Sequence, residues 1–167
     1  MSESDPILKY STARGYVQSA LLLISNPARF QVADDSSFFP AFHMLCGFAV
    51  ELYLKSFLEF AGVSERDLIR AGHNLFALQT VAHEKGLSDP AIAQLVDYLG
   101  EKHKSLEFRY MKASGRYDYG DLRLIFSAFS TLDNRVDQLI GARASYGLTS
   151  GGEWLLSERQ ARWRFTS

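Results

Sequence analysis

Cysteine is almost absent from this sequence of 167 residues, which contains only Cys46. A single thiol cannot form a disulfide within the chain, and it cannot build a zinc site made of thiolates. We therefore expect a cytoplasmic protein stabilised by its apolar core. With 47% hydrophobic residues, the chain is long enough to bury such a core within one domain.

An excess of either charge is also lacking, because 18 basic residues face 19 acidic ones and the net charge is -1. Nothing indicates DNA as a partner, and an RNA site would have to be a local basic patch. The sequence contains no uninterrupted apolar run of about 18 residues, the length that a membrane span needs. The nearest approach, residues 42–58, is interrupted by His43, Glu51 and Lys55. We expect no membrane partner and no signal peptide.

Several motifs of established chemistry are missing. The sequence has no Walker loop, no GxGxxG after a strand, no HExxH and no GxSxG. Its four histidines are not spaced as metal ligands along the chain. We therefore expect no metal and no cofactor, and the usual hydrolases and metalloenzymes are not indicated.

Apolar residues do recur, and their spacing is helical throughout. The expected helices span residues 6–24, about 40–60, 64–71, 74–86, 90 to about 111, and 121 to about 142. The sequence predicts an all-α protein, an antiparallel bundle of four to five helices that forms a single domain over residues 1–150. Residues 151–167 form a short tail, whose tryptophans we expect to dock on the body or on a partner.

A polar stripe interrupts the most apolar segment. His43, Gly47, Glu51 and Lys55 are each four residues apart, so they share one face of a helix. Glu51 precedes Lys55 in the order that favours a helical ion pair. The pair either lies in a cleft with shifted pKa values and binds a ligand, or simply fixes helix packing. Because this helix is apolar nearly all round, we expect a homodimer that helps to enclose it.

Two further segments carry candidate functional residues. His73 stands at a helix start, where it can relay a proton, cap the helix or form a hydrogen bond with Glu51. Arg109 and Tyr110 belong to a segment that holds six basic residues between positions 102 and 123, with tyrosines interleaved. Such a segment suits phosphate contacts and base stacking, or it is an ordinary solvated face.

Three motifs in order give the chain a family resemblance. The segment VELYLKSFL at residues 50–58 is similar to an E-L-x-L-K-x-x-L helix, and GHNL at 72–75 with Leu78 is similar to a G-H-D-L-x-x-L segment. Arg109-Tyr110 stands where related sequences carry an R-Y pair. Residues 42–110 thus resemble the HEPN superfamily of prokaryotic helical-bundle proteins. The resemblance implies a bundle, usually dimeric, linked to RNA cleavage, toxin–antitoxin pairs, phage defence or nucleotide binding.

Ribonuclease members of that family carry an arginine and a histidine with four to six residues between them. The only match here runs from Arg66 to His73 and crosses an expected helix break at Gly72. An enzyme is therefore not the favoured interpretation.

Three hypotheses remain. The leading one is a binding module for RNA, a nucleotide or an antitoxin-like partner protein, and its ligand-binding residues are Glu51, Lys55, His73, Arg109 and Tyr110. The second is a metal-independent endoribonuclease in which His73 is the catalytic acid or base and Arg66 or Arg109 stabilises charge on the phosphate. The third is a structural dimeric interaction protein.

Overall fold

In the computed structural model, residues 5–31, 39–110, 120–149 and 154–163 are described, and these residues form helices and no strand. The helices are, in chain order, α1 (Pro6–Ser25), η1 (Pro27–Gln31), α2 (Phe39–Phe60), α3 (Glu65–Ala71), α4 (Leu75–Glu84), α5 (Pro90–Lys104), η3 (Glu107–Arg109), α6 (Leu122–Ile140) and α7 (Ala142–Ser145). The expected all-α class is therefore confirmed.

Local side chains determine where most of these helices begin. The residue before each of five helices accepts a hydrogen bond from a backbone N–H of the first turn, as an N-cap does. These residues are Asp5, Ser64, Asn74, Asp89 and Asp121. Helices α3 and α6 end at Gly72 and Gly141, whose φ angles of 57° and 68° favour glycine.

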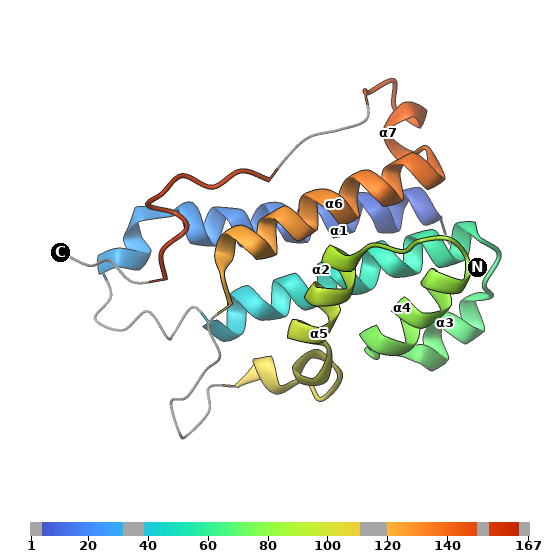
Figure 1. Cartoon of the computed structure of the whole chain (residues 1–167), viewed down its shortest axis with the longest axis horizontal. Coiled ribbons are helices and arrows are strands. Elements are labelled where there is room, and N and C mark those ends of the chain that lie inside the picture. Colours follow the sequence, from blue (N-terminus) through green and yellow to red (C-terminus); the bar gives the residue numbers. More distant parts are fainter. Residues whose placement is uncertain (1–4, 32–38, 111–119, 150–153, 164–167) are drawn as a thin grey trace.

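Three long helices lie lengthwise beside one another (Figure 1). Helix α1 runs opposite to α2, whereas α2 and α6 run in the same direction. Helices α3 and α4 lie at the end of the molecule that holds the C-terminal half of α2, and α5 packs against α2, α4 and α6. Helix α2 thus has neighbours on all sides.

Helix α2 is the centre of the core, since 14 of its 22 residues are buried. Among the described helices it alone is long and apolar enough to cross a membrane, but 67% of the relevant window is buried inside the structure. A single chain therefore encloses this helix. The homodimer expected from the sequence stays a prediction.

Helix α5 is shorter than the sequence predicted. It ends at Lys104 rather than near Met111, because Leu106 adopts a left-handed conformation with φ 57°. The short helix η3 then places Phe108 in the core. The expected loop over residues 113–120 and the connector at 34–37 lie almost entirely outside the described residues.

Residues 154–163 of the tail pack on the body. Trp154 and Trp163 lie against the core, and the Trp163 Nε1–H donates a hydrogen bond of 2.6 Å to the Gly120 carbonyl. The buried Arg29 guanidinium donates to the carbonyl of Arg162. The described part of the tail is thus held to η1 and to the start of α6.

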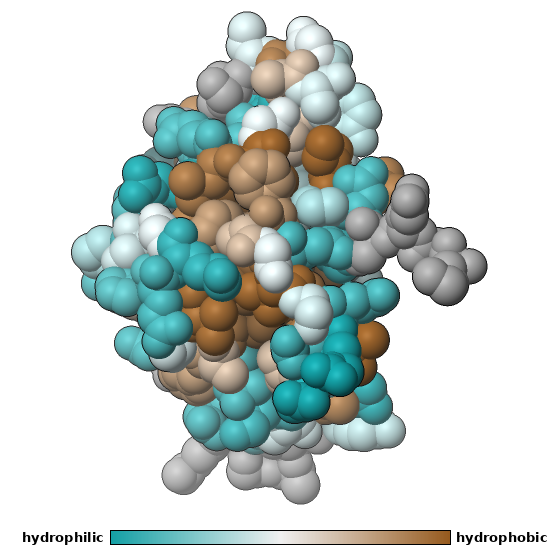
Figure 2. All heavy atoms as spheres, turned by 90° about the vertical axis from the view of Figure 1, so that its right-hand side faces the viewer, coloured by the Kyte–Doolittle hydropathy of each residue, from teal (hydrophilic) through white to brown (hydrophobic). Residues whose placement is uncertain are grey.

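Apolar side chains are exposed at one end of the molecule. Figure 2 shows this end, with hydrophobic atoms gathered across the middle of the face. The elements that meet there include the start of α1, the end of α2 and α3 (Figure 1). They expose Leu8, Phe60 and Ile69 by 58%, 56% and 70%.

Candidate functional site

Glu51 is the centre of the most polar cluster in the core. Its Oε1 accepts a hydrogen bond of 2.6 Å from Lys55 Nζ, one helical turn further along α2. Its Oε2 accepts from His73 Nδ1 at 2.8 Å and from His103 Nε2 at 2.7 Å. The expected ion pair is confirmed, and among the alternatives considered for His73 the hydrogen bond with Glu51 is present. We call these four residues the Glu51 cluster.

Three segments of the chain bring the cluster together. Glu51 and Lys55 lie on α2, His73 lies in the link between α3 and α4, and His103 lies in the last turn of α5. The N-cap Asn74 fixes the start of α4 directly after His73. The exposed fraction of the side chain is 2% for His103, 6% for Glu51 and 40% for His73. The cluster is therefore buried on one side and open on the other.

The two imidazole rings are held by close packing. A Cβ atom at Gly47 would lie 2.3 Å from His103 Nδ1, so only glycine lets the ring rest this near α2. The Phe48 ring lies edge-on against both imidazoles, with interplanar angles of 83° to His73 and 88° to His103. Packing therefore directs both histidine nitrogens toward Glu51.

The electrostatics of the cluster favour an ionised carboxylate. Burial raises the pKa of the Glu51 carboxyl, but hydrogen bonds from its three donors and the charge of Lys55 outweigh burial and lower the pKa to about 2. With Nδ1–H donating to Glu51, a neutral His73 ring presents Nε2 as its acceptor. A carboxylate–histidine pair whose second ring nitrogen carries no hydrogen bond can accept and pass on a proton.

The sequence also suggested Arg109, Tyr110 and Arg66 as site residues, and all three are exposed. Arg109 is exposed and lines a shallow hollow together with Phe48 and His103, while Tyr110 next to it is 79% exposed. Arg66 lies exposed on α3, where its charge acts on Asp67. Among the interactions of the described residues, none joins Arg66 to the Glu51 cluster.

A second buried histidine, His43, lies on the same face of α2, two helical turns before Glu51. His43 Nδ1 donates to the Phe39 carbonyl at 2.8 Å, so Nε2 accepts from the Tyr98 hydroxyl. That hydroxyl in turn accepts the Gly120 N–H at 2.8 Å. Burial lowers the pKa of His43 to about 4, with a further contribution from the charge of Lys102, and the ring is neutral at pH 7. Its position is structural, joining α2 to α5.

A third polar group joins α1, α2 and α6. Asp133 accepts from Arg14 at 2.9 Å and from the Tyr53 hydroxyl at 3.1 Å. Burial raises the pKa of the Asp133 carboxyl in spite of these partners. Arg14 also lies 5.3 Å from the centre of the Trp154 ring. The group fixes the packing of α1, α2 and α6.

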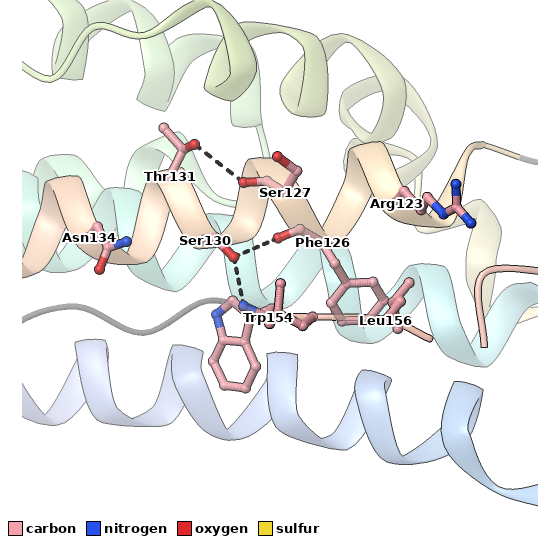
Figure 3. Close-up of a pocket in the computed structure, with 9 residues that line it drawn as sticks. Arg123, Phe126, Ser127, Ser130, Thr131, Asn134, Trp154 and Leu156 are labelled. Atoms are coloured by element: carbon pink, nitrogen blue, oxygen red, sulfur yellow. Dashed lines mark hydrogen bonds between the residues drawn. The ribbon is translucent and has the colours of Figure 1, made fainter. Parts of the chain in front are cut away.

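A hollow of about 380 Å³ lies between α6 and the tail (Figure 3). Two of its three hydroxyl groups already form hydrogen bonds. Ser130 donates to the Phe126 carbonyl and accepts the Trp154 N–H at 2.7 Å, and Thr131 donates to the Ser127 carbonyl. Arg123, its one charged residue, pairs with Glu158. The hollow thus presents few polar groups that are available to bind a ligand, and the Glu51 cluster is the stronger candidate site.

His103 is the residue of the site that sequence reasoning missed. A signal was present, because His103 continues the buried stripe of α5 at helical spacing from Leu95 and Leu99. That pattern places the imidazole in the core, where a polar partner is required. It does not say that Glu51 is the partner.

In comparisons with protein-family models, curated proteins and solved structures, no match to this chain was found.

Proposed function

We propose that the protein is an HEPN-like binding module whose ligand is single-stranded RNA. The ligand lies over the open side of the Glu51 cluster and contacts Arg109 and Tyr110. The proposal rests on one observation above all: exposed Arg109 shares a hollow with His103, which is itself bonded to Glu51. The Arg109 side chain thus lies beside the buried His103, which belongs to the same cluster as the half-exposed His73.

The chemistry of this surface suits RNA. Arginine makes directed contacts with phosphate, and an exposed tyrosine offers a face on which a base can stack. Tyr110 is 79% exposed directly beside Arg109. The last turn of α5 adds Lys102 and Lys104, so basic side chains gather near Arg109 although the whole chain is nearly neutral.

The experiment measures binding of a fluorescently labelled single-stranded RNA by anisotropy at several salt concentrations, with EDTA present. We expect Arg109→Ala to weaken binding about tenfold and to lower the salt slope by about 0.7, the contribution of one phosphate contact. Tyr110→Ala should weaken binding by a similar factor through lost stacking.

Arg135→Ala is the matched control, because Arg135 is an exposed arginine on α6 and its removal changes the net charge equally. This variant should bind as the wild type does. Equal losses in the Arg109 and Arg135 variants would reduce the effect to overall charge, and no binding by the wild type would contradict the proposal and favour a structural interaction protein.

A second candidate function is a metal-independent endoribonuclease. The observation that favours it is the pairing of an ionised Glu51 with His73, which leaves His73 Nε2 on a ring that is 40% exposed. RNA cleavage in EDTA that is lost in His73→Ala and retained in His83→Ala, an exposed histidine of α4, would support this activity. Intact RNA after incubation with the wild type would exclude it for the RNAs tested.

A further inference from the structure

We propose that the Glu51 cluster is a binding site for a divalent transition-metal ion, with zinc as the best fit. The ligands are Glu51 Oε2, His73 Nδ1 and His103 Nε2. These three atoms all lie within 4.8 Å of one another. The site does not depend on the proposed RNA binding, and its test uses no RNA.

The donor set determines which ion is suitable. Two imidazole nitrogens and one carboxylate oxygen are typical ligands of zinc and of neighbouring transition metals. Calcium and magnesium prefer oxygen ligands, and this site offers only the Glu51 carboxylate for them. Three protein ligands leave at least one coordination position open, as in zinc sites that bind water or substrate.

The geometry already points three donors at a common centre. The two histidine nitrogens lie 2.8 Å and 2.7 Å from the same carboxylate oxygen. Ligands about 2.1 Å from a tetrahedral zinc ion lie about 3.4 Å apart, so the donors must separate by about 0.6 Å. His73 can provide this movement, because it lies in a link between helices and its side chain is 40% exposed.

The surroundings resemble the outer shell that supports a metal site. Lys55 holds Glu51 Oε1 at 2.6 Å and leaves Oε2 directed at the histidines. Gly47 and Phe48 restrict the His103 ring. Such contacts orient ligands before the ion arrives and raise affinity. The open side at His73 supplies the entry route.

The test is a zinc titration of EDTA-treated full-length protein, followed by equilibrium dialysis and by the thermal unfolding temperature. The wild type should bind one equivalent of zinc per chain and unfold at a higher temperature when zinc is present. Cobalt should replace zinc and show the visible absorption of a site with nitrogen and oxygen ligands. His73→Ala, which removes a half-exposed ligand and leaves the buried residues in place, should bind zinc at least tenfold more weakly.

His83→Ala is the control, because it removes an exposed histidine outside the cluster. This variant should keep one equivalent of zinc and the same thermal shift. Three results would overturn the proposal: no stoichiometric zinc binding by the wild type, unchanged binding in His73→Ala, or equal losses in the two histidine variants. Circular dichroism without zinc checks that both variants are folded.

Discussion

The packing of His103 in the candidate site depends on the absence of a side chain at Gly47. In Gly47→Ala, the new Cβ would lie 2.3 Å from Nδ1 and 2.8 Å from Cγ of His103. Non-bonded carbon and nitrogen atoms do not approach this closely, so the buried ring must move by about 1 Å. Its hydrogen bond to Glu51 Oε2, now 2.7 Å, would then lengthen or break.

The expected loss of stability follows from these terms. Overpacking a core costs about 1–3 kcal/mol, and losing a hydrogen bond to a charged partner costs about 1.5–3 kcal/mol. Replacing a helical glycine by alanine returns about 0.5–1 kcal/mol through the unfolded state. Because the first two terms overlap, the net decrease in the free energy of unfolding should be about 2–4 kcal/mol. Urea denaturation followed by circular dichroism at pH 7 measures it.

Gly15→Ala is the matched control. Gly15 is an exposed residue of helix α1, and nothing lies within 4 Å of a Cβ placed there. This variant should gain about 0.5–1 kcal/mol, the ordinary benefit of alanine in a helix. In a His103→Ala background, Gly47→Ala should likewise lose its cost, because the clashing ring is gone. If Gly47→Ala instead unfolds at the same urea concentration as Gly15→Ala, the account of how His103 packs on α2 is wrong.

Two other predictions concern the contacts of α5 and the tail. Because burial lowers the pKa of His43 to about 4, the unfolded chain binds more protons below pH 6.5. Stability linked to this residue is therefore present above pH 6.5 and decreases by up to about 3 kcal/mol as the pH falls to 4. Urea midpoints at pH 7 and pH 4.5 should differ less in His43→Phe than in the wild type. Trp163→Phe should lose about 1 kcal/mol with the 2.6 Å bond to Gly120, whereas Trp154→Phe should be neutral or stabilising, because the buried Trp154 Nε1 has no partner within the described part of the chain. A larger loss in the Trp154 variant would contradict this comparison.

Local patterns in the sequence predicted much of the fold. Helix α2 ends near Phe60, Ser64 caps α3 and Asp89 precedes α5, because caps, glycines and periodicity act within a few residues of themselves. The predicted end of α5 was wrong because Leu106 lies at helical spacing from Leu99, so the apolar pattern continues beyond Lys104. The left-handed Leu106 breaks that continuity, and no residue nearby announces it.

The candidate site, too, was predicted only in part from the sequence. The pair of Glu51 and Lys55 follows from spacing along one helix, and the bond from His73 was among the foreseen alternatives. His103 could not be joined to Glu51 in advance, because 52 residues separate them and only the packing of α5 on α2 brings them together. The close approach of the His103 ring to Gly47 likewise depends on how α5 packs on α2, which the sequence of neither helix shows by itself.

The buried polar residues of α2 do more than interrupt an apolar helix: they form hydrogen bonds that hold α5 in place. His43 accepts a hydrogen bond from the Tyr98 hydroxyl, and two turns later Glu51 accepts one from the His103 imidazole. Apolar packing alone would tolerate sliding of α5 along α2, but two directional bonds at separate places define a single register. The buried members of the stripe thus position α5, and α5 in turn fixes the start of the segment that carries Arg109. The exposed Arg109, which we propose as an RNA contact, thus owes its position to the buried contacts between α2 and α5.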